Sequence, residues 1–204
     1  MDKYQENLIQ AYDRGANERD KAEVPVWKEE ICHKFLSIIR AENKTSLIDI
    51  GAGTGVHGKY FQDEGVDVTC VDLSPAHVEK CREKGLRSIE LDILHLDLFS
   101  EKFDCAFALS SLLHIPSADL PLALANIAKL LDSGGLMLWA QYGGEDREGI
   151  YEEDHYLPKR FFNLLDDRTM IQFAAREFQI ENLERLHDVQ LDPLHFQSLL
   201  LRAK

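Results

Sequence analysis

A glycine-rich bend at residues 47–58 constrains the fold of this chain more than any other feature. The stretch reads LIDIGAGTGVHG, with an apolar run that ends at Ile50 and glycines at Gly51, Gly53 and Gly55. Such a pattern predicts a buried strand that turns sharply into a helix and leaves its backbone open to a ligand. We therefore expect a binding site for a flat or narrow molecule at this bend.

The glycine spacing alone permits a dinucleotide as the ligand. Gly53, Gly55 and Gly58 match the pattern G-x-G-x-x-G, and Asp72 follows at about the distance found in NAD-binding sites. The carboxylate of Asp49, however, lies at the end of the strand, beside the bend. It would repel a pyrophosphate and attract an ammonium or sulfonium group, so a cationic nucleoside is favoured over NAD.

The motif D-I-G-A-G-T-G at residues 49–55 resembles the first motif of class I S-adenosylmethionine-dependent methyltransferases. The resemblance runs from about Ser46 to Gln141 and continues more weakly to the C-terminus. It implies an α/β fold with a doubly wound, mostly parallel, Rossmann-like sheet of seven strands and an N-terminal helical cap. The single domain would comprise a cap (1–45), a cofactor-binding core (46–141), a lid loop (142–163) and a C-terminal helix with a strand pair (164–204).

Asp72 ends the second predicted strand of this core, at residues 66–71. The two oxygens of one carboxylate match the two hydroxyls of a ribose. Asp72 could instead cap the following helix, but Ser74 is also placed to do so. We therefore favour the ribose role for Asp72.

The resemblance also implies roles at the ends of the next two strands. Asp92 would meet the adenine amino group and the backbone of Ile93 a ring nitrogen, although Asp92 could be an ordinary turn residue. The carbonyl of Leu109 would hold the methionine amine. The cofactor residues implied are Asp49, Gly51, Ala52, Gly53, Gly55, Asp72, Leu73, Asp92, Ile93 and Leu109.

Residues for the methyl acceptor are harder to identify. Tyr12 and Arg14 lie in the cap, where Tyr12 could equally be a packing residue. His114 follows the fourth strand and could face the acceptor or be a structural, hydrogen-bonded histidine. Four polar residues of the lid are expected to point inward, namely Asp154, His155, Tyr156 and Arg160. The acceptor candidates are Tyr12, His114, Tyr142, His155, Tyr156 and Arg160.

The lid at residues 141–161 shows no helical period and is predicted to be a long loop over the carboxyl ends of the strands. Its acids could attract a cationic acceptor, but a solvated face is the favoured interpretation. Hydrophobic spacing elsewhere predicts regular elements. The expected helices are 4–16, 27–40, 56–64, 75–84, 120–131 and 166–178, and the further strands are 87–91, 103–109, 136–140, 179–186 and 195–202.

The composition of the chain limits the kinds of partner that it is expected to bind. The net charge is −13, which disfavours nucleic acid and anionic membranes and favours a small molecule. The polar start and the lack of a spanning apolar run suggest a cytoplasmic protein, either a monomer or a homodimer. We expect no metal site and four reduced, buried cysteines, namely Cys32, Cys70, Cys81 and Cys105.

The leading hypothesis is methyl transfer from S-adenosylmethionine, with S-adenosylhomocysteine as product, to a small molecule. The alternatives are a protein or RNA methyltransferase, a catalytically silent S-adenosylmethionine-binding module, and an NAD-dependent oxidoreductase. No N-P-P-Y-type motif follows the fourth strand, where the sequence reads LSSLLH. Because methyl transfer mainly requires alignment of the reacting atoms, the sequence identifies no catalytic residue.

Overall fold

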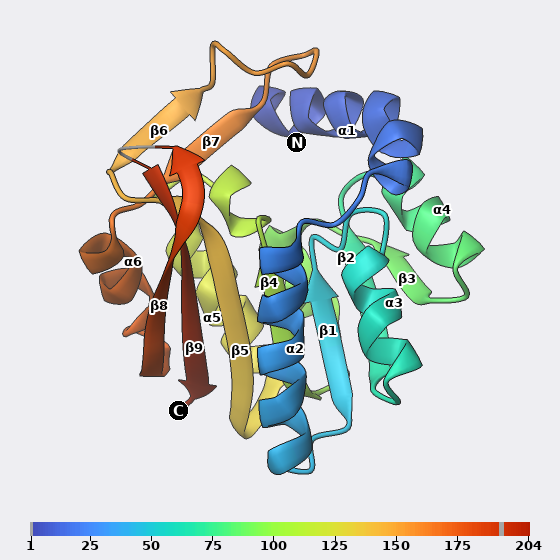
Figure 1. Cartoon of the computed structure of the whole chain (residues 1–204), viewed down its shortest axis with the longest axis vertical. Coiled ribbons are helices and arrows are strands. Elements are labelled where there is room, and N and C mark those ends of the chain that lie inside the picture. Colours follow the sequence, from blue (N-terminus) through green and yellow to red (C-terminus); the bar gives the residue numbers. More distant parts are fainter. Residues whose placement is uncertain (1, 192–193) are drawn as a thin grey trace.

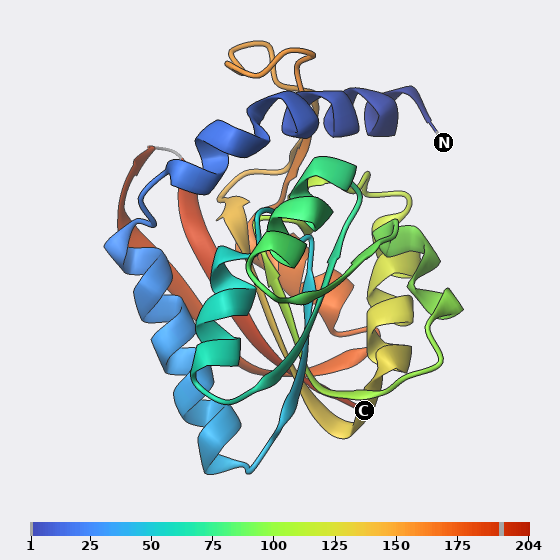
Figure 2. The same cartoon turned by 90° about the vertical axis from the view of Figure 1, so that its right-hand side faces the viewer.

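The structure, a computed structural model, describes residues 2–191 and 194–204. A seven-stranded sheet forms its centre, with the strand order β3-β2-β1-β4-β5-β9-β8. Helices α2 and α3 cover one face and helices α5 and α6 the other (Figures 1 and 2). The sheet strands are β1 (Ser46–Ile50), β2 (Asp67–Asp72), β3 (Arg87–Glu90), β4 (Phe103–Leu109), β5 (Leu131–Gly143), β8 (Phe178–Leu191) and β9 (Leu194–Ala203).

The order of the strands reverses between β1 and β4. Strands β1 to β5 pair in parallel, whereas β9 runs antiparallel to both β5 and β8. This confirms the predicted doubly wound, mostly parallel sheet with a terminal strand pair. Ligands of such sheets bind beyond the carboxyl ends of the strands, at the point of reversal.

Both faces of the central strands are buried, as parallel pairing requires. In β5, Leu138 packs with α2 and α3 on one face, while Trp139 packs with α5 and α6 on the other. Both face layers are built from amphipathic helices. The helices and helical turns are α1 (Lys3–Lys21), α2 (Val26–Ala41), α3 (Val56–Asp63), α4 (Pro75–Glu83), η1 (Ile93–Leu98), η2 (Leu112–His114), α5 (Leu120–Leu130) and α6 (Asp167–Ala174).

Helix α1 lies across the carboxyl ends of the strands as the cap (Figures 1 and 2). It continues to Lys21, beyond the predicted end at Ala16, because polar residues with good helix propensity extend it. Its contacts with the core include a hydrogen bond of 2.6 Å from Ser74 Oγ to Asp13 Oδ1. The cap is therefore tied to the start of α4, next to the strand ends.

The lid differs from the predicted irregular loop. Strands β6 (Arg147–Ile150) and β7 (Phe161–Leu164) form a separate antiparallel pair within it. Residues 147–150 lack the apolar alternation of a half-buried strand, so the pairing depends on backbone hydrogen bonds that sequence periodicity does not reveal. Helix α6 is also shorter than predicted, because the chain returns to the sheet at Phe178.

The four cysteines are buried and free, as predicted. Among the described residues, the structure contains no helix long and apolar enough to cross a membrane. It also places no group of three or more potential metal-ligating His, Cys, Asp or Glu side chains together in that part of the chain.

Candidate active site

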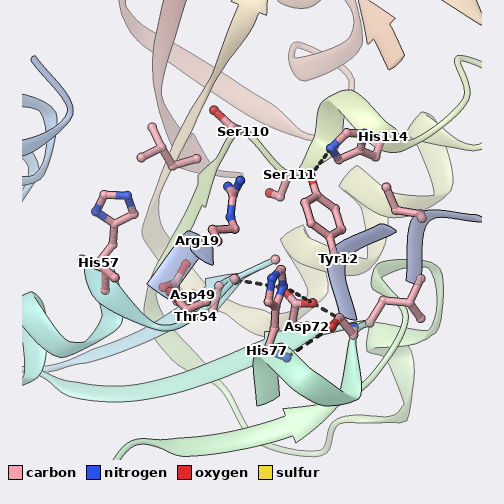
Figure 3. A pocket seen from close by; sticks show the side chains of 18 of the residues that line it. Tyr12, Arg19, Asp49, Thr54, His57, Asp72, His77, Ser110, Ser111 and His114 are labelled. Atoms are coloured by element: carbon pink, nitrogen blue, oxygen red, sulfur yellow. Dashed lines mark hydrogen bonds and ion pairs between the residues drawn. The ribbon is translucent and has the colours of Figure 1, made fainter. Parts of the chain in front are cut away.

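A cavity of about 240 Å³ lies between α1 and the carboxyl ends of the sheet strands. The bend after β1 forms its floor and α1 forms its roof. The turn after β4 forms one wall (Figure 3). Every predicted cofactor residue except Gly55 lines this cavity, and so do Tyr12 and His114 of the acceptor candidates.

The glycines of the bend allow its backbone to pass close to its neighbours. Gly51, Gly53 and Gly55 all have positive φ, at 69°, 58° and 79°. A Cβ atom on Gly51 would lie 2.3 Å from the Cβ of Ser111. Only glycine fits there, and Gly55 then serves as the N-cap of α3. The bend therefore presents bare backbone to the cavity.

Asp49 lies beneath the bend with 2% of its surface exposed. Its Oδ2 atom is buried and has no hydrogen-bond partner among the described residues. Burial, followed by the charge of Asp72, raises the pKa of Asp49 to about 7. A buried carboxyl group with an open acceptor atom in a cavity wall is suited to a cationic ligand group.

Asp72 is held beside the same bend. Its Oδ2 accepts a hydrogen bond from the backbone N–H of Gly53 at 2.8 Å, and its Oδ1 accepts one from Ser74 at 2.9 Å. Ser74 is the N-cap of α4, as its alternative role predicted. The Nδ1 of His77 also lies 3.3 Å from Oδ1. Each carboxylate oxygen can accept two hydrogen bonds, so Oδ2 retains one acceptor position for a ligand hydroxyl.

Asp92 links the end of β3 to the cap. Its Oδ1 accepts from the backbone N–H of Leu94 and so caps η1. Its Oδ2 accepts from the side-chain amide of Gln5 in α1, at 2.6 Å. An amide N–H thus already occupies one of the two acceptor positions of Asp92 Oδ2.

Several other buried polar atoms of the cavity wall have no partner among the described residues. They are the Tyr4 hydroxyl, His77 Nε2, and the hydroxyls of Ser110 and Ser111. Ser110 also has a left-handed backbone, with φ of 56°. Strained residues and unpaired buried polar atoms are typical of functional sites.

Tyr12 and His114 are brought together above the turn after β4 (Figure 3). The Nδ1 of His114 lies 2.7 Å from the carbonyl oxygen of Phe161, and its Nε2 lies 2.6 Å from the Tyr12 hydroxyl. Burial, aided by the charges of Arg160 and Arg19, lowers the pKa of His114 to about 3. The ring is therefore neutral, with Nδ1 donating to the carbonyl and Nε2 accepting from Tyr12.

Asp154 and Arg160 of the lid do face inward, but they pair with each other. The Nε and Nη2 atoms of Arg160 donate to the Asp154 carboxylate at 2.8 and 2.9 Å. Its Nη1 donates to the Tyr12 hydroxyl at 3.1 Å, and its guanidinium lies 3.9 Å from the ring centre of Tyr156. This ion pair therefore fastens the lid to the cap.

Two expectations for acceptor candidates are not met by their positions. The prediction that His155 looks inward is wrong, because 83% of its side chain is exposed. Tyr142 packs edge-on against Phe196, at 5.0 Å between ring centres, outside the cavity lining.

Arg14 donates to the carbonyl of Leu157 in the lid. The lid acids Asp146, Glu148, Glu152 and Glu153 are exposed, in agreement with a solvated face.

Sequence reasoning missed the basic residues of the cavity, Arg19 and Lys28, together with His57. Arg19 was outside the predicted first helix. It lies two turns after Tyr12, so both project from the same face of α1. The seven-residue spacing between Tyr12 and Arg19 was the sequence signal that could have identified Arg19. Lys28 and His57 sit at the starts of α2 and α3, where no motif marked them.

Residues 47–135 match the family model described as a methyltransferase domain. The matched segment therefore resembles a methyltransferase domain. It runs from β1 to the start of β5 and includes the bend, Asp72 and Asp92.

Among curated relatives, this chain is 26% identical over 135 residues to a malonyl-[acyl-carrier protein] O-methyltransferase of Hamiltonella defensa subsp. Acyrthosiphon pisum. The alignment covers 65% of this chain and 51% of that protein. The chain therefore spans about half the length of the curated relatives it matches first.

Solved structures share the fold. The 1,6-didemethyltoxoflavin-N1-methyltransferase of Burkholderia thailandensis, with bound S-adenosylhomocysteine, matches 97% of this chain and 87% of its own at 20% identity, with a TM-score of 0.72. The [4+2]-cyclase SpnF matches 78% of this chain and 75% of its own at 17% identity, with a TM-score of 0.61. Because the second neighbour is named as a cyclase, the fold by itself does not define the reaction.

Proposed function

We propose that this protein transfers a methyl group from S-adenosylmethionine to a small-molecule acceptor and releases S-adenosylhomocysteine. The observation that carries the proposal is the unpartnered Oδ2 of buried Asp49 beneath the glycine bend. The ammonium or sulfonium group of the cofactor would be attracted to this carboxylate. A pyrophosphate would be repelled by it, which separates this proposal from NAD binding.

The remaining cavity residues fit an adenosine group. The Oδ2 of Asp72 has a free acceptor position for a ribose hydroxyl, beside the backbone of Leu73. The Oδ2 of Asp92 has a second acceptor position for an amine beside the Gln5 amide, and Ile93 follows it in the wall. The proposed cofactor-binding residues are Asp49, Gly51, Ala52, Gly53, Gly55, Asp72, Leu73, Asp92, Ile93 and Leu109.

The cofactor would supply an electrophilic methyl group on a sulfonium. The protein's own task is then to align the acceptor and to exclude water. Helix α1 roofs the cavity, and the neutral Nε2 of His114 and the Tyr12 hydroxyl lie in its wall. We propose that the acceptor enters beside Tyr12 and His114, with Tyr156 and Arg160 holding the lid behind them.

The proposed organisation is a single domain with a cap at 1–45, a core at 46–141, a lid at 142–163 and a C-terminal segment at 164–204. The relatives support methyl transfer to small molecules, as the name 1,6-didemethyltoxoflavin-N1-methyltransferase indicates for one of them. The net charge of −13 also favours a small acceptor over nucleic acid.

Incubation with methyl-labelled S-adenosylmethionine and fractionated cell extract tests the proposal. We expect label in one or a few small compounds, identified by mass spectrometry, and a lower rate of labelling with an Asp49→Asn variant at a cofactor concentration below saturation. Label confined to protein or RNA would contradict the small-molecule acceptor. Binding of S-adenosylmethionine without any transfer would favour a silent cofactor-binding module.

A further inference from the structure

Three hydrogen bonds in series meet at the Tyr12 hydroxyl in the cavity wall. Arg160 Nη1 lies 3.1 Å from this hydroxyl, and His114 Nε2 lies 2.6 Å from it on the other side (Figure 3). His114 Nδ1 in turn lies 2.7 Å from the carbonyl oxygen of Phe161. The two ends of the series have fixed roles, because a guanidinium can only donate and a backbone carbonyl can only accept. The direction of each bond follows from these ends.

The direction of these bonds makes Tyr12 an acceptor toward a ligand. The Phe161 carbonyl places the proton of neutral His114 on Nδ1, so Nε2 accepts and the Tyr12 hydroxyl donates its proton there. One lone pair of the Tyr12 oxygen accepts from Arg160, and the second has no partner in the described part of the chain. Because Tyr12 lines the cavity, a ligand group beside it can donate a hydrogen bond to this hydroxyl but cannot accept one.

This direction distinguishes between classes of methyl acceptor. A carboxylate has no proton to donate and would place its lone pairs against that of Tyr12. A hydroxyl can donate, but it becomes a strong nucleophile only after it loses its proton. His114 is a poor base for that proton, since burial, first of all, lowers its pKa to about 3. An amine donates one N–H and still keeps a lone pair for the methyl group.

The charges around Tyr12 favour the neutral form of such an amine. The guanidinium carbons of Arg160 and Arg19 lie 5.2 and 5.4 Å from the centre of the Tyr12 ring. Asp154 pairs with Arg160, and Asp72 is the other acid whose charge reaches this hydroxyl. Burial, first of all, raises the pKa of Tyr12, and the charges of Arg160 and Arg19 act on it more strongly than that of Asp72. An ammonium group here would be repelled, whereas the neutral amine keeps its lone pair free.

We propose that the methyl acceptor is a neutral primary or secondary amine whose N–H donates to the Tyr12 hydroxyl. This inference rests on the proposed function, in which the acceptor enters beside Tyr12 and His114, and it names the class of that acceptor. The amine lone pair forms the N–CH₃ bond while the S–CH₃ bond breaks, and the electron pair of the broken bond stays on sulfur. The product forms as a methylated ammonium ion and releases one proton to water after it leaves the site.

The first test identifies the atom that is methylated. The unmodified protein is incubated with ¹³C-methyl-labelled S-adenosylmethionine and the small-molecule fraction of a cell extract, and the products are examined by NMR before and after mild alkali. We expect N-methyl signals that shift with pH as the amine titrates, and no loss of label in alkali. Acetylation of the amines in the extract beforehand should abolish labelling. Label in a methyl ester, which alkali releases as methanol, or in an ether, thioether or C-methyl group would overturn the inference.

The second test reverses the direction of the hydrogen bond at Tyr12. The amine found in the first test is the acceptor, and the cofactor is saturating, so that cofactor affinity does not affect the rate. His114→Gln keeps an amide N–H for Phe161 and an amide oxygen for Tyr12, so the rate should stay within about threefold. His114→Leu frees the Tyr12 hydroxyl to donate toward the amine, and the rate should fall roughly 10-fold or more. Equal losses in the two variants would overturn the orienting role of Tyr12.

Controls and a second variant keep these outcomes interpretable. Tyr12→Phe removes the accepting oxygen and should also lower the rate roughly 10-fold, so it decides the matter if circular dichroism and thermal melting show that His114→Leu is not folded. Tyr60→Phe, which removes a hydroxyl of α3 outside the cavity lining, should leave the rate unchanged. Label on an atom other than nitrogen contradicts only the inference. No transfer to any compound by the unmodified protein contradicts the proposed function itself, and the inference with it.

Discussion

The hydroxyl of Tyr12 lies 2.6 Å from the Nε2 atom of His114, so one hydrogen bond joins the cap helix α1 to the turn after β4. The two residues are 102 positions apart in the sequence. Arg160 donates to the same hydroxyl from the lid, at 3.1 Å. The Tyr12 hydroxyl therefore connects the cap, the core and the lid by hydrogen bonds.

Replacing Tyr12 by Phe should lower the free energy of unfolding by about 1–3 kcal/mol, because His114 and Arg160 would each lose a buried partner. Hydrogen exchange along α1 should also become faster. Tyr142→Phe is the matched control, since no hydrogen bond to its hydroxyl is formed among the described residues. Equal stability of the two variants would show that the bond does not hold the cap.

His114 should remain neutral throughout the range from pH 5 to pH 8. Burial lowers its pKa to about 3, and the Phe161 carbonyl fixes the proton on Nδ1. Long-range ¹H–¹⁵N NMR spectra, assigned with a His114→Gln variant, should show the Nδ1–H tautomer without titration. A midpoint near pH 6.5 would mean that the ring is solvated and that the Tyr12 contact is not formed in solution.

Ionisation of the buried Asp49 carboxyl group should lower the free energy of unfolding as the pH rises. Its pKa is about 7 in the folded protein against 3.8 ordinarily, so between these values the folded state retains a proton that the unfolded state has lost. The unmodified protein should therefore lose stability from pH 4 to pH 7 relative to Asp49→Asn, by on the order of 2–4 kcal/mol. Urea unfolding at pH 5 and pH 8 measures the difference.

The control for this experiment is Asp67→Asn at the exposed start of β2. Its stability should follow that of the unmodified protein at both pH values. A constant difference between Asp49→Asn and the unmodified protein would show that Asp49 is not buried as an ionisable group.

Gly51 should tolerate no side chain. Gly51 and Gly65 both have positive φ, at 69° and 90°, but a Cβ atom would clash with Ser111 only at Gly51. Gly65→Ala should cost about 1–2 kcal/mol from backbone strain alone. Gly51→Ala should cost about 1–3 kcal/mol more through the overlap, measured by urea unfolding, and should abolish binding of S-adenosylhomocysteine. Equal costs would contradict the close packing of the bend.

Much of the fold was predictable because its signals are local. A few consecutive residues are enough to favour one conformation in each of these places. They are the apolar runs of β1 and β4, the glycines of the bend and the caps of α3 and α4. The β6–β7 pair was missed because residues 147–150 lack apolar alternation and the ten residues that join the strands are not a short hairpin turn. Its pairing depends on backbone hydrogen bonds, which hydrophobic periodicity does not report.

The site was only partly predictable for the same reason. Asp49 and Asp72 stand at strand ends, where their neighbours in sequence define their surroundings. Arg19 and Lys28 reach the cavity only when α1 and α2 pack beside the glycine bend. His155 was misplaced because a polar lid residue gives no signal of which way it faces.

The most direct test of the central claim is calorimetric titration of the purified protein with S-adenosylhomocysteine and with NAD. We predict that S-adenosylhomocysteine binds, that Asp49→Asn weakens it by roughly 10-fold or more through loss of a charge-assisted contact, and that NAD gives no binding heat. Preferential binding of NAD, or S-adenosylhomocysteine affinity unaffected by Asp49→Asn, would contradict the claim that this buried carboxylate selects a positively charged nucleoside.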